Sequence, residues 1–386
     1  MTYHEHAINP NKIQHFQVTA LLAAVLLVGS NAFVLSPILS EVAQGLASEP
    51  FRIAWAISAF GAATAVSALT LAGLIDRIPA GRVLGGAALL LALAQASSGL
   101  SQGWLWLCLS QAGAGVAVGI LLPGTYATAV ATAPTGRESA RLGVVLTGWA
   151  LSLVFAVPLA ALITEQFGWR MVYALLSGLS ALVGLCLMLA LRGTKTAAPS
   201  RTPPWRAARL PGVPLLLVVM FTYMTAFYGS FAFFGEGVRN AFGLSASGTG
   251  LFVLAYGLGF GLAGLGLGMI APRITRTYVL LALSGIAASY AGWHVALATP
   301  VLAFAAAMIW GILNQLGLNA LMIVLNRHAT QARGAVMGLN SAVTYSAVFA
   351  GPLVMGPIYA GFGFAAVSIF AAALIVAGAV VSRKAI

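Results

Sequence analysis

The sequence predicts an all-α integral membrane protein with twelve transmembrane helices. Hydrophobic residues make up 60% of the 386 residues and charged residues only 7%, whereas soluble domains carry about 25% charged residues. The mean hydropathy is +0.97. The apolar residues are grouped in stretches of about 20, the length that crosses a bilayer as a helix. A helix is expected because it satisfies its backbone hydrogen bonds internally where no water is available.

Short polar loops separate the predicted spans. The first is too long for the apolar core of a signal peptide and eleven more follow it, so it is expected to be a retained helix. The predicted limits are residues 16–40, 52–74, 83–101, 104–132, 141–164, 170–191, 213–235, 246–271, 277–294, 299–325, 335–361 and 363–382.

The basic residues predict the orientation of the chain. With both termini in the cytosol, 16 of the 19 Lys and Arg residues lie on the cytosolic side, and only Arg52, Arg170 and Arg239 lie outside. Cytosolic loops carry this excess of Lys and Arg. We therefore expect a multi-pass protein of the bacterial inner membrane, a monomer whose basic loops meet anionic lipid rather than nucleic acid.

The two halves of the sequence resemble each other. Residues 1–192 hold six predicted spans with a short tail, and residues 213–386 hold six more. The segment 193–212 between them is rich in proline and basic residues, as expected of a linker. Pro158 and Pro352 interrupt the fifth and eleventh spans, at equivalent places in the two halves. This repeat predicts two pseudo-symmetric six-helix bundles with a binding site between them.

The loop between the second and third spans holds the only aspartate of the chain, Asp76, between Ile75 and Arg77 and near Arg82. A carboxylate at the end of one helix can accept hydrogen bonds from the N-terminus of another and is stabilised by its dipole. One hypothesis is therefore a charge-based latch at the cytosolic surface. The alternative is a juxtamembrane Asp-Arg pair that only sets topology.

Several segments resemble the major facilitator superfamily, and within it the twelve-helix drug and sugar efflux branch. They are the Asp76-Arg77 pair, SPILSEVA at Ser36–Ala43, VPLAALITEQFGWR at Val157–Arg170 and RGAVMGLNSAVTY at Arg333–Tyr345. The resemblance implies two bundles that alternate access, and export of a small molecule in exchange for protons. It also implies that Asp76, positioned by Arg77, fastens the halves while the cavity opens outward, with Arg82 serving late in the loop.

Proline and glycine are expected to shape the helices. Pro158 in the fifth span, and Gly351 and Pro352 in the eleventh, predict bends there. The run Tyr256–Met269 contains glycines at i,i+4, a spacing that lets helices pack closely. It also contains a G-x-G-x-x-G pattern, but no strand precedes it, so nucleotide binding is not expected.

Polar and aromatic residues at the middle of the membrane are the candidates for substrate contacts, because they must face a cavity or another helix. All of them are uncharged, which predicts a neutral or amphipathic substrate. Each could equally bond to a neighbouring helix. The candidates are Asn31, Tyr126, Tyr223, Phe227, Tyr228, Asn314, Gln315, Asn319, Asn340 and Tyr345.

Groups that could carry a proton are scarce. Glu236, near the outer end of the seventh span, is the leading candidate and is expected to border the cavity; alternatively, it is an interfacial anchor paired with Arg239. The histidines near the N-terminus could imitate a metal site, but a cytosolic tail is the expected explanation. No metal and no cofactor are predicted.

The sequence bears on three classes of function: an enzyme, a receptor or scaffold, and a transporter. An enzyme would need a cluster of His, Asp or Glu at the membrane, which the sequence lacks. A receptor or scaffold without transport stays open as an alternative. Among transporters, a proton-driven exporter comes first by resemblance. A facilitative uniporter is the alternative, because Ala32 and Leu109 stand where relatives carry an acid and an arginine.

Overall fold

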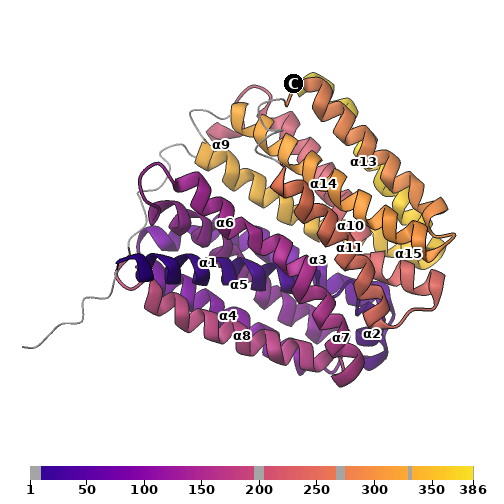
Figure 1. Ribbon diagram of the computed structural model, residues 1–386, viewed down its shortest axis with the longest axis horizontal. Helices are drawn as coiled ribbons and strands as arrows, with labels where there is room; N and C mark the ends of the chain where they lie inside the picture. The colour runs from indigo at the N-terminus through magenta and orange to yellow at the C-terminus, as the bar shows by residue number, and fades with distance from the viewer. Residues whose placement is uncertain (1–9, 195–203, 267–273, 329–332, 386) are drawn as a thin grey trace, which may run out of the picture.

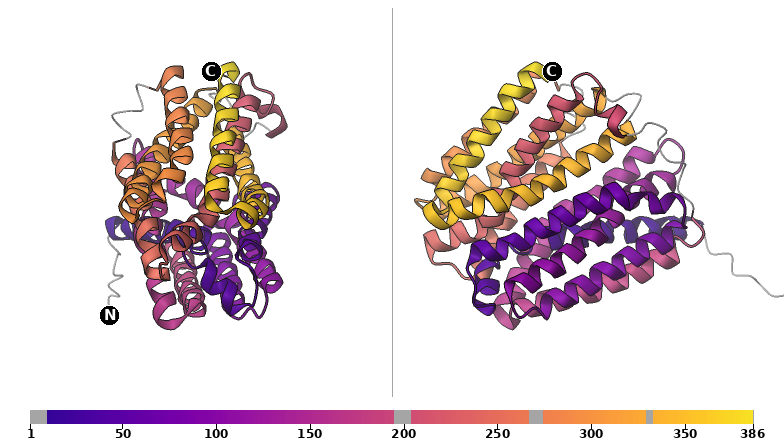
Figure 2. Two further views of the ribbon diagram at one scale, coloured as in Figure 1. Left: turned by 90° about the vertical axis from the view of Figure 1, so that its right-hand side faces the viewer. Right: turned by 180° about the vertical axis from the view of Figure 1, so that it is seen from behind.

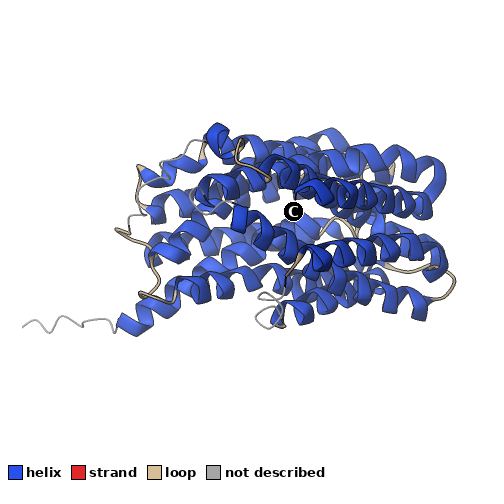
Figure 3. Cartoon of the chain, turned by 90° about the horizontal axis from the view of Figure 1, so that it is seen from above, coloured by secondary structure: helices blue, strands red, loops and turns tan. Residues whose placement is uncertain are grey.

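The computed structural model describes residues 10–194, 204–266, 274–328 and 333–385. In these ranges the regular structure is helical, and no strand is present (Figure 3). The two halves of the chain form two bundles, indigo to magenta and orange to yellow in Figure 1. Figure 2 shows the same division from the side and from behind. The predicted fold class, an all-helical membrane protein built from two bundles, is therefore confirmed.

The first bundle contains the helices that precede residue 193. The helix α2 and the turn η1 are too short to span a membrane, and α6, η2 and α7 follow one another as a single span, Glu138–Phe167. The helices are α1 (Pro10–Phe33), α2 (Leu39–Gly45), α3 (Pro50–Thr70), η1 (Ala72–Asp76), α4 (Ala80–Gly99), α5 (Trp104–Ala131), α6 (Glu138–Leu151), η2 (Ser152–Ala156), α7 (Val157–Phe167) and α8 (Trp169–Ala190).

The second bundle follows a short helix, α9 (Pro204–Ala207), which lies in the predicted linker. Its long helices are α10 (Val213–Phe242), α11 (Ala246–Leu265), α13 (Arg276–Ala296), α14 (Pro300–His328) and α15 (Arg333–Ala385). Part of the predicted eighth span, residues 267–271, lies outside the described residues.

Helix α15 contains two of the predicted spans. The described residues include eleven helices that are long and apolar enough to cross a membrane, and the last of these covers Ala335–Ala385. Gly363 breaks it, with φ 74° and ψ −174°. Only glycine adopts such a conformation readily. The break separates the eleventh span from the twelfth at the predicted position.

The first span ends earlier than predicted. Helix α1 ends at Phe33, and the chain turns before α2 begins at Leu39. Pro37 explains the early end, because a proline disfavours helical backbone in the residue before it and has no N–H to donate. The prediction of a helix through residue 40 was wrong, because apolar composition alone does not mark where a helix stops.

The fifth span is interrupted at the predicted proline. Helix α6 passes into the π-helical turn η2 at Ser152–Ala156, and Pro158 is the second residue of α7. A π-bulge relieves the loss of the hydrogen bond that proline cannot donate, and such bulges are frequent at functional sites.

Glycines bring the two bundles close together. Helix α3 packs on α15, and α7 packs on α11. A Cβ atom added to Gly61 would lie 2.6 Å from the backbone nitrogen of Phe349, and one added to Gly257 would lie 2.9 Å from the carbonyl carbon of Leu153. Backbones that approach this closely need residues without a side chain.

Candidate functional site

A cavity of about 330 Å³ lies between the two bundles, within the range of about 300–1,000 Å³ typical of small-molecule sites. Residues of α1, α5, α6 and η2 line it from the first bundle, and residues of α10, α11, α14 and α15 from the second. None of the lining residues is Asp, Glu, Lys, Arg or His. The cavity therefore suits an uncharged molecule with a large apolar surface.

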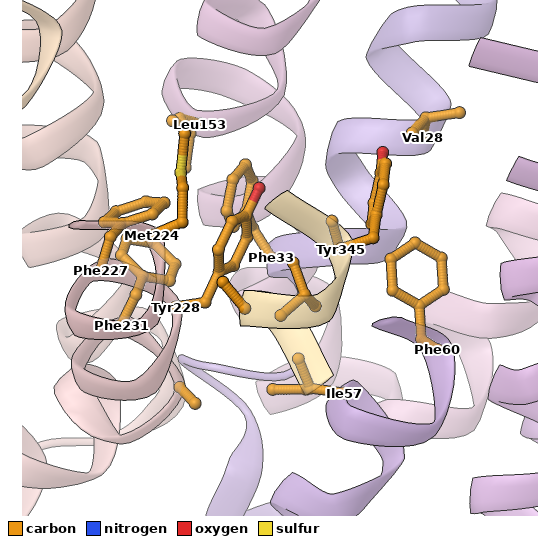
Figure 4. Packing of buried hydrophobic residues seen from close by; sticks show 14 of the residues in the cluster. Val28, Phe33, Ile57, Phe60, Leu153, Met224, Phe227, Tyr228, Phe231 and Tyr345 are labelled. Carbon is orange, nitrogen blue, oxygen red and sulfur yellow. The ribbon is translucent and has the colours of Figure 1, made fainter. Parts of the chain in front are cut away.

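Aromatic rings form one wall of the cavity. The ring of Phe33, at the end of α1, lies 5.8 Å from that of Trp149, 6.0 Å from that of Tyr228 and 6.1 Å from that of Phe227. Phe33 belongs to the first bundle, whereas Tyr228 and Phe227 belong to α10 (Figure 4). Offset or edge-to-face ring pairs at such distances are favourable. This wall therefore spans the boundary between the bundles.

Three polar residues of the second bundle hold one another in place. The amide nitrogen of Asn314 donates to the hydroxyl of Tyr256 at 3.1 Å. The Tyr223 hydroxyl donates to the backbone carbonyl oxygen of Asn314 at 2.7 Å, and the Asn314 Oδ1 lies 3.3 Å from the same hydroxyl. Their hydrogen-bonding capacity is largely used within the protein. They shape the cavity wall.

Two amide oxygens in the cavity lining lack such partners. The Gln315 Oε1 and the Asn340 Oδ1 are buried and accept no hydrogen bond. The Asn340 nitrogen contacts the Met322 sulfur at 3.3 Å. Buried acceptors are normally satisfied, and each one left unsatisfied needs an explanation.

Nine of the ten residues predicted to contact substrate line this one cavity: Tyr126, Tyr223, Phe227, Tyr228, Asn314, Gln315, Asn319, Asn340 and Tyr345. Their role in binding stays a prediction. Sequence reasoning missed Phe33, Trp149, Tyr256 and Phe260, which also line the cavity. All four are aromatic residues inside predicted spans, the same signal that identified Phe227.

Asn31 is the candidate that the structure places elsewhere. It is 3% exposed, and it is absent from the cavity lining. Its amide donates to Gln111 at 3.0 Å and accepts from Gln95 at 3.3 Å. Ser180 donates to Gln95 at 2.7 Å. Asn31 therefore joins helices α1, α4, α5 and α8, because a polar residue at this depth can be satisfied by neighbouring helices as well as by a ligand.

Replacing Asn31 with alanine should destabilise the first bundle and leave ligand affinity unchanged. The substitution removes two hydrogen bonds and leaves Gln95 and Gln111 partly unsatisfied, at a cost of about 1–3 kcal/mol for a buried polar group. The thermal unfolding midpoint of the purified protein would report the loss. An unchanged midpoint together with weakened ligand binding would instead indicate that Asn31 contacts the ligand.

The cavity is closed at one end by polar contacts between the bundles. Among the described residues, the hydrogen bonds that join the halves all lie at the end carrying α2 and the last turns of α7 and α10. Glu41 forms an ion pair with Arg239, and Ser40 donates to Glu236. The Ser247 backbone nitrogen donates to Glu165 at 3.1 Å. We call these contacts the polar gate.

Glu236 belongs to the polar gate and not to the cavity. It is 5% exposed, and it accepts hydrogen bonds from Ser40 and, at 3.1 Å, from Asn240. Arg239 pairs with Glu41, so the alternative of a Glu236–Arg239 pair was also incorrect. Glu236 and Arg239 are close together on α10, yet they bind different residues of the first bundle. Their spacing in the sequence does not show which partner each one has.

The opposite end of the bundles carries the first residues of α1, helix α9 and the end of α15 (Figure 1). Arg77 and Arg82 are exposed there. The side chain of Asp76 lies outside the described residues, so the latch stays a prediction.

The predicted bend at Gly351 coincides with close packing. A Cβ atom at this position would lie 2.6 Å from the backbone nitrogen of Gly229 on α10. Pro352 follows it inside α15. Gly351 thus permits the approach of two helices within the second bundle, a role that the sequence pattern did not distinguish from bending.

No candidate metal site is evident among the described side chains, since no three His, Cys, Asp or Glu residues gather in one place.

Comparison with known proteins identifies the family. The sequence model of the Major Facilitator Superfamily matches residues 21–352. The chain is 30% identical over 372 residues to the uncharacterized MFS-type transporter YwfA of Bacillus subtilis (strain 168), covering 94% of this chain and 90% of that protein.

Solved structures agree on the fold. A bacterial homolog of the human lysosomal transporter Spinster, in an inward-facing and occupied conformation, superposes with a TM-score of 0.79 at 15% identity, covering 98% of this chain and 97% of the other. Its inward-facing, unoccupied form gives 0.75. At this identity the likeness shows the fold alone. With the family match across most of its length, the chain belongs to the Major Facilitator Superfamily and is a membrane transporter.

Proposed function

We propose that the protein is a secondary transporter that exports a small neutral or amphipathic molecule by alternating access. The observation that carries this proposal is the uncharged cavity between the bundles, which the polar gate closes at one end. Transporters of this architecture bind substrate near the midplane, between their repeats.

The orientation follows from the basic residues, which favour a cytosolic location for both termini. The polar gate then lies on the outer side of the membrane, and the cavity belongs to an inward-facing state. In the outward-facing state the gate would be open. Asp76 would then be placed to latch the cytosolic side, with Arg77 as its positioning partner.

Proton coupling distinguishes the exporter from the uniporter, and Glu236 is our candidate for the coupling residue. It is the buried carboxylate of the polar gate, so opening of the gate would expose it to the outer solution. A group whose environment differs between two states changes its proton affinity with them. The cavity lining contains no acidic, basic or histidine side chain. This favours the alternative function, a uniporter without proton coupling.

Flux into proteoliposomes tests both candidates. A radiolabelled compound that raises the unfolding temperature of the purified protein serves as substrate, with and without an imposed pH gradient. We expect the gradient to accelerate flux in the wild type, and Glu236→Gln to abolish that response while exchange of substrate across the membrane continues. Asn240→Leu, which removes a neighbouring amide and keeps the carboxylate, is the control.

The outcomes separate the alternatives. Flux that ignores the gradient in the wild type selects the uniporter. If Glu236→Gln still responds fully to the gradient, Glu236 does not carry the proton. The remaining candidates are then Glu41, Glu165 and His294. Binding without any flux rejects transport and favours the receptor.

A further inference from the structure

The two bundles bring different kinds of side chain to the cavity. The lining residues of the first bundle are Phe33, Leu122, Tyr126, Leu146, Trp149 and Leu153. Their two polar groups bond to each other, because the Trp149 indole nitrogen donates to the Tyr126 hydroxyl at 2.8 Å. The first-bundle wall is therefore mainly apolar, and it offers a ligand at most the remaining bond of this one hydroxyl.

The free polar groups of the cavity come from the second bundle. The hydroxyls of Tyr228 on α10 and Tyr345 on α15 line the cavity and form no hydrogen bond within the described part of the protein. The protein does not seal either hydroxyl from the cavity. In Figure 4 both hydroxyls point the same way, away from Ile57. A ligand in the cavity can therefore reach both of them.

Helices α14 and α15 supply further free groups. Ser341 and Thr344 lie on the same face of α15 as Tyr345, at i, i+3 and i+4, and their hydroxyls also lack a hydrogen bond in the described structure. The oxygen of Gln315 is buried, so its nitrogen is the accessible end of the amide. The nitrogen of Asn319 donates to the Gln315 backbone oxygen at 2.8 Å, which leaves the Asn319 oxygen free. We call this set the polar wall: Tyr228, Gln315, Asn319, Ser341, Thr344 and Tyr345.

The contrast between the two walls orients a ligand. A polar group placed against the first-bundle wall gives up its bonds to water and gains few in return, whereas on the polar wall it exchanges them for bonds to the protein. An apolar group over the polar wall displaces water from hydroxyls that then lack partners. The same apolar group is favoured against the rings and leucines of the first bundle.

Resting on the proposed transport function, we propose that the substrate is an amphiphile with an uncharged polar end, and that it binds in one orientation. Its polar end, a hydroxyl or amide group, hydrogen-bonds to the polar wall of the second bundle, and its apolar body packs on the first bundle. The second bundle thus selects the chemistry of the polar end, and the first selects the size of the apolar body. Donors and acceptors are both suitable, because the polar wall presents both.

Two probes with the same ring system test the proposal. Naphthaleneacetamide carries an uncharged amide, and ethylnaphthalene has a methyl group in its place. Binding to the protein in lipid nanodiscs is measured by equilibrium dialysis, with empty nanodiscs subtracted for partition into lipid. Tyr228→Phe combined with Tyr345→Phe removes both free hydroxyls and keeps the rings. This tyrosine variant should weaken naphthaleneacetamide about tenfold and leave ethylnaphthalene unchanged.

Leu146→Ala probes the opposite wall. Leu146 lines the cavity from α6 and is 40% exposed, so its truncation removes apolar contact without opening the core. It should weaken both probes alike, about fivefold. Tyr173→Phe is the matched control for loss of a tyrosine hydroxyl, because Tyr173 is buried on α8, outside the cavity lining, and its hydroxyl has no hydrogen bond. Both affinities should stay at the wild-type values in this control.

An equal effect of the tyrosine variant on both probes, no effect on either, or failure of naphthaleneacetamide to bind the wild type would overturn the proposal. So would a loss confined to naphthaleneacetamide in Leu146→Ala, because the polar end would then lie on the first bundle. If the tyrosine variant fails to fold, Asn319→Leu removes another group of the polar wall and should give the same contrast between the probes.

Binding needs no transport, so these results are independent of flux. A protein that shows the expected contrast but moves no substrate would retain this site and lose the proposed function. A protein that transports but shows no contrast would keep the proposed function and lose the orientation.

Discussion

Replacing Gly235 with alanine is expected to hold the two bundles apart at the polar gate. A Cβ atom here would meet the Ser36 carbonyl oxygen and lie 2.7 Å from the carbonyl carbon and 2.9 Å from the Cα of Pro37. These are backbone atoms of the other bundle, which cannot turn aside as a side chain would. Overpacking costs about 1–3 kcal/mol, which shifts the balance toward the outward-open state about five- to 150-fold.

Distances between spin labels on α2 and on the last turn of α10 would report the shift, in a background without Cys108 and Cys186. Transport should fall, because closure of the gate completes the cycle. The protein should remain folded, because the contact lies between the bundles and not inside either. Gly292→Ala on α13 is the matched control, since a Cβ atom there meets open space. Normal gate distances in Gly235→Ala would contradict the assigned interface.

Reversing the charge of Arg239 should open the same gate by repulsion. Arg239 forms its ion pair with Glu41. Glu236 lies three residues earlier on the same helix, about one helical turn away, and accepts a hydrogen bond from Ser40. Arg239→Glu would gather three carboxylates at the gate. Like charges brought together cost several kcal/mol, but the Glu41 and Arg239 side chains are each 21% exposed and so partly screened. We expect a penalty of about 2 kcal/mol, or about thirtyfold in the population of the closed gate.

A charge swap provides the decisive comparison. Glu41→Arg combined with Arg239→Glu restores opposite charges and should recover closure and transport. Arg52→Glu makes the same change of net charge at the same end, but Arg52 contacts the ring of Phe51 in its own bundle, so it should leave the gate closed. If the swap fails to rescue Arg239→Glu while both proteins fold, the ion pair does not hold the gate.

Much of the architecture could be predicted from the sequence. The spans, the break between the eleventh and twelfth helices and the interruption near Pro158 all follow from local properties: apolar length, proline chemistry and the conformational freedom of glycine. The end of α1 was placed too late because the apolar pattern continues through Ser36 and Pro37, where the helix stops.

The sequence by itself determined the class of protein, its family and the uncharged character of the cavity, because each depends on which residues are present. Only the tertiary structure decided which polar residues face the cavity. Asn31 and Asn340 are both uncharged polar side chains inside predicted spans, yet Gln111 and Gln95 satisfy the first while the oxygen of the second accepts no hydrogen bond. The physical reason is that helices apolar on every side carry little periodicity to fix their rotation. Packing against neighbouring helices sets that rotation, and with it the partner of each buried polar group.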